Sequence, residues 1–328
     1  MILGLNTVKT AIRGTADMEL IDQKLWLHRF TAAQREAYRT YSLDFLKKAK
    51  ATAGVRLEFA TDSTTLRLTG ECYAASSRQF FGFDVYVNGS LVCHQLNTLG
   101  EEGSAYMLEA QLGSAKTKNV VVYFPWSVQA NIGSLSLDDD AVFEPIYRSY
   151  KMICFGDSIT HGYDAKNPSF SYANRLADAL CADHINKGIG AEVFYPTLAA
   201  LKDDYDPDYI TVAYGTNDWS HSKKEDFDKD SVLFFENLAK SYPRAKIFAL
   251  TPVWRRNCET RETEVGKFLY VTETLEKIAD AIPGVECIDC IDCIPHDPQY
   301  YVADVLHPND AGFYHYAAGL YAEIKKRI

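Results

Sequence analysis

The chain has 328 residues, of which 47% are hydrophobic and 24% are charged. This composition is typical of a folded globular protein and excludes a disordered or collagen-like chain. Acidic residues outnumber basic ones by 44 to 34, giving a net charge of −10. Such a surface repels phosphate groups, so nucleic acid is not expected as a partner. No apolar stretch approaches the roughly 20 residues that cross a bilayer, so membrane insertion is not expected either.

The amino terminus and the cysteines both indicate in which cellular compartment the protein is expected. The first residues lack the basic region and long apolar core of a signal peptide, so we expect a cytoplasmic protein whose eight cysteines are free thiols. Cys287, Cys290 and Cys293 are spaced closely enough to suggest a metal site. They lie, however, in an apolar run that predicts a strand, and a nearby fourth ligand is missing. We therefore expect no metal and no other cofactor.

Residues 1–146 are predicted to form a first domain, an all-β sandwich of the jelly-roll type. Alternating apolar residues predict short strands at 55–59, 65–69, 83–87, 91–93, 120–124 and 133–137. Asn88-Gly89 predicts a hairpin between the third and fourth of these strands. Short strands separated by turn residues are typical of a sandwich or jelly roll. Residues 31–49 are expected to form a helix or a long connection.

Residues 147–328 are predicted to form a second domain of the α/β class. Apolar strands are expected at 152–155, 209–214, 246–250 and 285–291, and helices at 171–180, 232–240, 263–281 and 310–326. A strand followed by a helix, repeated four times, predicts a parallel sheet that is covered on both faces. Right-handed crossovers then give a three-layer α/β/α arrangement.

Clusters of small and polar residues occur where strands of this predicted sheet end. The clusters are Gly156–Gly162, Ile185–Gly190, Gly215–Asp218 and Asp304–Pro308. In open parallel sheets the ligand crevice lies beyond the carboxyl ends of the strands. We therefore expect the four clusters to converge on one site.

The residue types in these clusters fit nucleophilic catalysis by a serine. Ser158 is a poor nucleophile unaided and needs a base, which His307 can supply. Asp304, three residues before His307, can accept a hydrogen bond from its Nδ1 and fix its tautomer. The backbone N–H groups of Ser158 and Gly190, together with the side-chain amide of Asn217, can donate hydrogen bonds to an oxyanion.

Simpler assignments compete with these roles. Ser158 could serve only as the N-cap of a following helix, and Asn217 only as the cap of a turn. His161, His296 and His315 are alternative bases. His161 stands three residues beyond Ser158 on an incipient helix, where a side chain usually points elsewhere.

In chain order, the residues resemble the four blocks of the SGNH (GDSL-type) hydrolases: Gly156-Asp157-Ser158, Gly190, Gly215-x-Asn217 and Asp304-x-x-His307. The usual leucine after Gly-Asp-Ser is replaced by Ile159. The resemblance covers residues 156–307 and implies a flavodoxin-like sheet and metal-free ester hydrolysis through an acyl-enzyme. Some members of this family orient the histidine with a backbone carbonyl, so the need for Asp304 stays open.

The first domain is similar to the β-sandwich that precedes the catalytic domain in some bacterial SGNH esterases, including carbohydrate acetylesterases. Residues 52–56 and 124–126 carry this similarity. It implies removal of a short acyl group, above all acetyl, from a sugar or oligosaccharide. Trp219 and Trp254 follow two strand ends and are candidates for stacking on a sugar ring, with simple packing as the alternative.

Two other functions stay open at this stage. A lysophospholipase or thioesterase would use the same residues on longer acyl chains. A carbohydrate-binding protein would keep the fold with a vestigial hydrolase domain. The expected partner is a small-molecule or oligosaccharide ester, and the sequence also allows a homo-oligomer.

Overall fold

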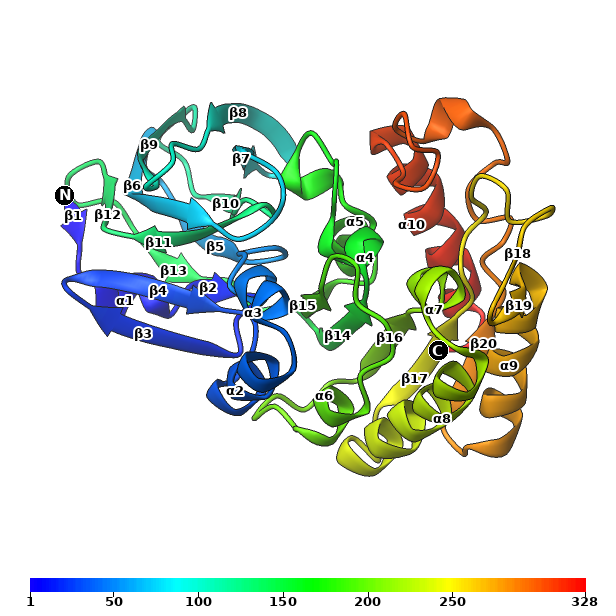
Figure 1. The fold of residues 1–328 in the computed structure, drawn as a ribbon. Helices are drawn as coiled ribbons and strands as arrows, with labels where there is room; N and C mark the ends of the chain where they lie inside the picture. The colour runs from blue at the N-terminus through cyan, green and yellow to red at the C-terminus, as the bar shows by residue number, and fades with distance from the viewer.

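The computed structural model describes residues 1–328 and contains two large antiparallel sheets followed by one parallel sheet and a two-stranded hairpin (Figure 1). The first antiparallel sheet has the strand order β1-β12-β6-β11-β4-β3, and β9 also pairs with β6. Its strands are β1 (Ile2–Leu3), β3 (Asp17–Ile21), β4 (Lys24–His28), β6 (Thr65–Ala74), β9 (Ser104–Gln111), β11 (Val128–Ile132) and β12 (Ser134–Leu137).

The second antiparallel sheet has the order β13-β5-β10-β7-β8, and β2 also pairs with β5. Its strands are β2 (Ile12–Arg13), β5 (Arg56–Thr61), β7 (Phe80–Val87), β8 (Ser90–Thr98), β10 (Lys118–Tyr123) and β13 (Glu144–Pro145). The two sheets enclose one core of 27 buried hydrophobic residues, among them Leu57, Leu68 and Phe83. The expected sandwich-like arrangement is therefore confirmed, and jelly-roll connectivity stays a prediction.

Two hairpins in the sandwich show why only one of them was predicted. The turn between β7 and β8 has positive φ at Asn88 (48°) and Gly89 (81°), as the Asn-Gly signal predicts. The turn between β3 and β4 also has positive φ at both central residues, but these are Asp22 (50°) and Gln23 (58°). Without glycine this turn has no strong sequence signal. Strands β3 and β4 were accordingly not predicted, and neither were β1, β2, β9, β11 and β13.

The parallel sheet has five strands in the order β15-β14-β16-β17-β20. They are β14 (Tyr150–Gly156), β15 (Ala182–Gly188), β16 (Tyr209–Ala213), β17 (Lys246–Leu250) and β20 (Val285–Ile288). Successive residues of β14 point to opposite faces, since Met152 and Cys154 belong to one hydrophobic core and Ile153 and Phe155 to another. Both faces of the sheet are therefore buried, as the predicted three-layer arrangement requires.

Helices from two sets cover the two faces. Helices α5 (Tyr172–Ala179) and α10 (Asp310–Lys325) contribute to the core on the Met152 face. Helices α6 (Pro196–Ala200), α8 (Lys224–Ser241) and α9 (Phe268–Ala281) contribute to the core on the other face. None of the helices combines the length and apolar character needed to span a membrane. The short remaining elements are α1 (Leu5–Lys9), α4 (Ser158–His161), α7 (Thr216–His221), β18 (Glu262–Thr263), β19 (Gly266–Lys267) and 3₁₀ turns at Pro168–Phe170 and Pro298–Tyr300.

The segment predicted as a helix or long connection forms two helices, α2 (Ala32–Tyr41) and α3 (Leu43–Ala49). Thr31 starts α2 with a capping box, and Ser42 ends it and caps α3. Both helices lie on the side of the sandwich nearest the parallel sheet (Figure 1). Phe30, Tyr38 and Ala49 belong to the core that α8 and α9 cover. An early stretch of the chain therefore completes the core of the parallel-sheet region.

Strand β15 is an edge strand of the parallel sheet, and its polar sequence Ala-Asp-His-Ile-Asn-Lys-Gly did not predict a strand. Its side chains meet polar groups instead of an apolar core. Arg56 of β5 donates to Asp183 at 2.8 Å and lies 3.1 Å from Nδ1 of His184. Lys187 is fully buried and donates to Asp203 at 2.7 Å. The strand is thus polar because its side chains form ionic contacts with Arg56 of the sandwich and with Asp203, which follows the strand.

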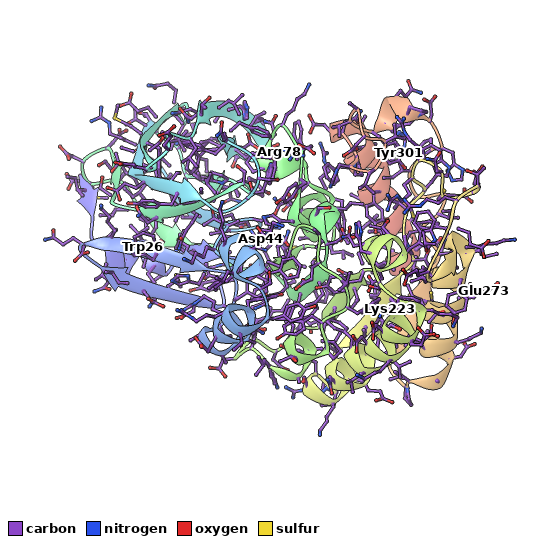
Figure 2. The ribbon with its side chains drawn as sticks, in the orientation of Figure 1. Trp26, Asp44, Arg78, Lys223, Glu273 and Tyr301 are labelled. Carbon is purple, nitrogen blue, oxygen red and sulfur yellow. The ribbon has the colours of Figure 1, made fainter.

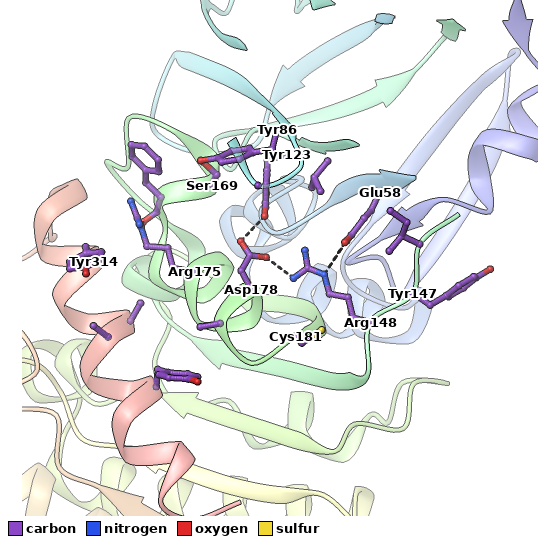
Figure 3. A pocket seen from close by; sticks show the side chains of 18 residues that line it. Glu58, Tyr86, Tyr123, Tyr147, Arg148, Ser169, Arg175, Asp178, Cys181 and Tyr314 are labelled. Carbon is purple, nitrogen blue, oxygen red and sulfur yellow. Dashed lines mark hydrogen bonds and ion pairs between the residues drawn. The ribbon is translucent and has the colours of Figure 1, made fainter. Parts of the chain in front are cut away.

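A pocket of about 690 Å³ lies between the second sandwich sheet and helices α5 and α10 (Figure 3). Arg148 joins its two walls by donating to Glu58 at 3.1 Å and to Asp178 at 2.5 Å. The Tyr123 hydroxyl also donates to Asp178, at 2.6 Å. These charged groups already have partners, and none of the predicted site residues lines the pocket.

Candidate active site

Ser158 follows β14 through a tight turn. Gly156 ends the strand, and a Cβ atom at this position would lie 2.1 Å from Oγ1 of Thr160, so the turn requires glycine. The Asp157 carboxylate caps α4 by accepting from the N–H of Ile159 at 2.9 Å. Ser158 is the first residue of this helix, so its own N–H has no acceptor within the helix.

His307 lies on a strained loop that precedes α10. The carboxylate of Asp304 accepts from the backbone N–H of Leu306 at 2.9 Å and of His307 at 3.0 Å. Val305 has a φ of +52°, which is costly for a β-branched residue and common at functional sites. The N–H of Arg256 donates to the Val305 carbonyl at 2.9 Å and ties this loop to the one after β17.

The structure brings Ser158, His307 and Asp304 together. Nε2 of His307 lies 2.8 Å from Oγ of Ser158, and Nδ1 of His307 lies 2.6 Å from Oδ2 of Asp304. Partial burial works against ionisation of Asp304, but hydrogen bonds from the side chain and backbone of His307 hold the pKa of this carboxyl well below its usual range. The ionised carboxylate accepts from Nδ1–H, which leaves Nε2 as the acceptor for the serine hydroxyl. This arrangement can deprotonate Ser158 as it attacks a carbonyl carbon.

The loops that carry Gly190 and Asn217 leave the same edge of the sheet as Ser158. Gly156 at the end of β14 is paired with Gly188 of β15 and with Ala213 of β16. Gly190 lies two residues beyond Gly188, and Asn217 lies four residues beyond Ala213. The three predicted oxyanion donors therefore start from adjacent strand ends, as expected for the crevice of a parallel sheet.

Each of these two loops keeps donors free of other partners. The backbone N–H of Gly190 donates to no protein group, while its carbonyl accepts from Nζ of Lys48 on α3 at 2.9 Å. Nδ2 of Asn217 donates to the Glu192 carbonyl at 3.1 Å, and an amide nitrogen carries a second hydrogen. A Cβ at position 190 would lie 2.7 Å from the hydroxyl of Tyr163, so any larger residue here would displace the Tyr163 ring.

A buried carboxyl group anchors the loop between Gly190 and α6. Glu192 accepts hydrogen bonds from Tyr38 on α2 and from Tyr214, both at 2.6 Å. Burial raises the pKa of Glu192 to about 8, although the two tyrosines partly oppose this shift. Asp218 accepts from the N–H groups of Phe194 and Gly215, both at 3.0 Å, and burial raises its pKa to about 7. The oxyanion loops are thus held by two buried carboxyl groups whose pKa values burial raises.

The competing histidines lie elsewhere. His161 is fully buried and its Nε2 lies 2.9 Å from the Trp126 carbonyl. His296 pairs with Asp292 at 3.1 Å, and the ring of His315 packs edge-on against Tyr300. Only His307, among the four candidates, contacts the Ser158 hydroxyl.

The two tryptophans predicted as substrate contacts have different surroundings. Trp219 is fully buried, packs edge-on against Phe268 and donates from Nε1 to the Gly266 carbonyl at 2.9 Å. Its ring has no face open to a ligand, so the prediction for Trp219 is wrong and the packing alternative holds. Trp254 is partly exposed and stacks on His296 with centroids 5.4 Å apart. Its role in binding stays a prediction.

Three residues near His307 were not singled out from the sequence. The Tyr163 ring stacks beside the His307 ring at 5.9 Å, and Oδ2 of Asp164 lies 3.9 Å from Nδ1 of His307. Arg78 pairs with Asp164 and lies on the side of the sandwich that faces the parallel-sheet region (Figure 2). Tyr163 and Asp164 directly follow the Gly156–Gly162 cluster, which was the available signal. Arg78 has no such signal because it comes from another part of the chain.

The three closely spaced cysteines do not form a metal cluster. Cys290 is fully buried and its thiol lies 3.3 Å from the Ile288 carbonyl, while Cys287 and Cys293 are partly exposed. No group of three or more histidine, cysteine or acidic side chains in the structure could hold a metal ion.

Comparison with known proteins agrees with the fold and with the four sequence blocks. Residues 154–314 match the GDSL-like Lipase/Acylhydrolase family. The fold is similar to a salicylyl-acyltransferase of a tetracycline biosynthetic pathway (TM-score 0.85, 21% identity, 96% of this chain and 94% of that one). It is also similar to a family two carbohydrate esterase from Clostridium thermocellum, solved with cellohexaose (TM-score 0.66, 19% identity, 84% of this chain and 93% of that one). A third similar structure is an acetyl xylan esterase from Butyrivibrio proteoclasticus (TM-score 0.61, 18% identity, 84% of this chain and 89% of that one).

No curated protein sequence matches the chain significantly. The solved structures are all below 25% identity and therefore show the fold, including the sandwich, rather than a substrate. The sequence family covers the strands and loops that carry Ser158, Gly190, Asn217 and His307. Residues 154–314 thus belong to the GDSL-like lipase/acylhydrolase family, and the chain is a hydrolase of carboxylic esters.

Proposed function

We propose that the protein is a serine esterase that removes a short acyl group, above all acetyl, from a carbohydrate hydroxyl. The observation that carries the proposal is the continuous contact from Asp304 through His307 to Ser158, with distances of 2.6 and 2.8 Å. In this proposal residues 147–328 form the catalytic domain, and residues 1–146 form an accessory domain that lends it helices α2 and α3.

The reaction proceeds in two halves. Oγ of Ser158 attacks the ester carbonyl carbon while Nε2 of His307 takes its proton, and the N–H groups of Ser158 and Gly190 with the Asn217 amide bind the oxyanion. The tetrahedral intermediate collapses, the C–O bond to the alcohol breaks, and His307 gives its proton to the departing oxygen. Water then attacks the acyl-enzyme and loses a proton to Nε2 of His307. The second tetrahedral intermediate collapses, the bond between the acyl carbon and Oγ of Ser158 breaks, and His307 returns the proton to Oγ as the carboxylic acid leaves.

Two observations support a short acyl group on a carbohydrate. Ser158 is only 6% exposed, and the buried ring of Tyr163 stacks against its partner His307, so there is little room near the nucleophile. The fold is similar to a carbohydrate esterase and to an acetyl xylan esterase over 84% of the chain. The partly exposed Trp254 is the remaining candidate for stacking on a sugar ring.

The role of Ser158 is tested by Ser158→Ala with p-nitrophenyl acetate as substrate. The variant should keep the wild-type unfolding midpoint and lose activity by several orders of magnitude, since removal of a triad serine costs about 10⁶-fold in kcat. Near-full activity in the variant would refute the assignment. A fluorophosphonate probe labels a competent Ser158, so failure of the wild type to label, with sugar binding intact, would favour a vestigial hydrolase domain.

The acyl preference is tested with p-nitrophenyl esters of increasing chain length, followed by acetylated oligosaccharides. The proposal predicts the highest kcat/KM for acetyl and a fall as the chain lengthens, because Tyr163 limits the space beside His307. A preference for acyl groups of eight carbons or more would instead identify a lysophospholipase or thioesterase.

A second candidate function is transfer of the acyl group to an alcohol other than water. The observation that favours it is the similarity to an acyltransferase along 96% of the chain. An added alcohol that captures the acyl-enzyme would yield a new ester in place of free acid. Product analysis in the presence of a sugar acceptor distinguishes the two, because hydrolysis gives acetate whether or not the acceptor is present.

We also propose a cytoplasmic location and a small-molecule or oligosaccharide ester as the partner. The eight cysteines are unpaired in the fold, which supports a reducing compartment.

A further inference from the structure

A second carboxylate lies close to His307. Oδ2 of Asp164 is 3.9 Å from Nδ1 of His307, the same nitrogen that contacts Asp304 at 2.6 Å. The side chains of Asp164 and His307 are each 14% exposed, whereas that of Asp304 is 43% exposed. The more distant carboxylate is therefore the better shielded one, and water screens its field at His307 less.

Arg78 of the sandwich holds this carboxylate in place. Nε and NH2 of Arg78 contact the two oxygens of Asp164 at 2.7 and 2.8 Å, a bidentate pair that fixes the carboxylate plane. The guanidinium also lies over the Tyr163 ring, 5.4 Å from its centroid. The hydrogen bond with Asp164 raises the pKa of Arg78, so the cation persists across the working pH range. The positive charge of Arg78, which belongs to the sandwich, thus contacts two residues that lie next to His307, namely Tyr163 and Asp164.

The backbone at Asp164 is held in an unusual conformation. Its φ is +68°, a region that aspartate and asparagine tolerate better than most residues. On one side Tyr163 stacks against His307, and on the other the Ala165 carbonyl accepts from Nε1 of Trp126 at 2.9 Å. A backbone strain held by contacts on both sides is typical of a functional position.

We infer that Asp164 is a second positioning carboxylate for His307, and that Arg78 sets how much of its charge the imidazole experiences. The inference rests on the proposed esterase function. Asp304 orients the ring through a direct hydrogen bond, and Asp164 stabilises the imidazolium that forms when Ser158 loses its proton. When Asp304 is removed, Asp164 is near enough to accept from Nδ1 after a small shift of the ring.

The sign of each effect follows from the charges around His307. These are Asp304 on its own loop, Asp157 beside Ser158, the Arg78–Asp164 pair, and Arg255, which acts on both Asp157 and Asp304. Asp164→Asn removes a negative charge and leaves Arg78 unpaired, which disfavours the imidazolium. Arg78→Gln leaves Asp164 unpaired, which favours it. The acidic limb of the kcat/KM profile should therefore move to lower pH in Asp164→Asn and to higher pH in Arg78→Gln.

The experiment measures pH profiles of p-nitrophenyl acetate hydrolysis for the full chain and for Asp164→Asn, Arg78→Gln, Asp304→Asn and the double variant Asp164→Asn/Asp304→Asn. Asparagine keeps the size and the tolerated positive φ at position 164. We expect Asp304→Asn alone to lose about 10- to 100-fold, well short of the roughly 10⁴-fold typical of a triad without its acid. The double variant should lose far more than the product of the two single losses.

The matched control is Arg148→Gln, which also breaks an ion pair between the sandwich and the parallel-sheet region but has no contact with His307. It should lower the unfolding midpoint and leave the acidic limb in place. The inference would be overturned if the acidic limb of the kcat/KM profile stayed at the wild-type pH in both Asp164→Asn and Arg78→Gln. It would also be overturned if the activity lost in the double variant equalled the product of the two single losses. An inactive wild type would instead refute the proposed esterase, so the two failures are distinguishable.

Discussion

The interior of the sandwich and the contact between the sandwich and the parallel sheet are stabilised in different ways. The sandwich core consists of 27 buried hydrophobic residues, such as Leu68 and Phe83. The contact, which we call the seam, buries charged groups instead: Arg29, Arg56 and Lys187 are all fully buried there. An apolar core tolerates small shifts of its members, whereas a buried charge requires particular partners at particular distances. The seam is therefore the part that fixes how the two regions are oriented.

Arg29 is the clearest example of this specificity. Its guanidinium donates to the carbonyls of Ala51 at 2.6 Å, Asn186 at 2.5 Å, Gly188 at 3.1 Å and Lys48 at 3.1 Å. Two of these acceptors lie at the end of β15, just before Gly190. The seam thus reaches the loop that carries a proposed oxyanion donor, and its loss should affect both stability and activity.

The largest effect is expected for Arg29→Met, which keeps an unbranched side chain but removes every donor. Four carbonyls lose a buried charged donor, so we expect the free energy of unfolding to fall by about 3–5 kcal/mol. Activity per folded molecule should fall as well, because the Gly188–Gly190 segment loses its anchor. Urea titration and p-nitrophenyl acetate hydrolysis measure the two effects.

A core deletion in the sandwich provides the contrast. Leu68→Ala removes a fully buried side chain and should cost about 3 kcal/mol through lost burial and the cavity left behind. Its kcat/KM should stay at the wild-type value in the folded protein, because no polar contact with β15 changes. A parallel loss of activity in both variants would contradict the distinction between seam and core.

A pH-dependent effect on stability is expected at Glu192, which joins α2 to the oxyanion loops. Burial raises its pKa to about 8 in the folded protein, against an ordinary value of 4.5. Between pH 4.5 and pH 8 the folded protein keeps the Glu192 proton, whereas the unfolded chain releases it. The resulting contribution to stability is complete below pH 4.5 and is lost as pH rises towards 8, at about 1.4 kcal/mol per pH unit.

Glu192→Gln removes this titration and keeps acceptor capacity for Tyr38 and Tyr214. The stability of the variant relative to wild type should therefore increase from pH 5 to pH 8. A residual slope of the same sign is expected, because burial also raises the pKa of Asp157 to about 6 and of Asp218 to about 7. Identical slopes for variant and wild type would show that Glu192 is ionised in the fold.

The smallest effect is expected for an ion pair outside the seam. Arg67 and Glu109 pair on the surface of the sandwich, with side chains 58% and 52% exposed. Arg67→Ala should change the free energy of unfolding by less than about 0.5 kcal/mol, because solvent screens exposed pairs. A loss comparable to that of Arg29→Met would remove the basis for treating seam charges as special.

The same contrast explains what the sequence could predict. Apolar periodicity predicted four of the five parallel strands and the sandwich hairpin at Asn88-Gly89, because each depends on local pattern. Strand β15 was missed, since its Asp183, His184 and Lys187 are explained only by partners elsewhere in the chain.

The site shows a similar division. Ser158, Gly190, Asn217 and His307 follow strand ends that a parallel sheet places on one edge, so their proximity could be predicted. Arg78 could not, because a sandwich loop carries it to Asp164 through tertiary packing. Trp219 was mispredicted because a position after a strand end does not reveal which way the side chain points.

Formation of an acyl-enzyme on Ser158 can be detected by mass spectrometry of protein quenched in acid during turnover of p-nitrophenyl acetate. We expect one added acetyl group, located on the peptide that contains Ser158 and absent from Ser158→Ala. Full turnover by the wild type with acetyl on another residue, or full activity of Ser158→Ala, would contradict this expectation.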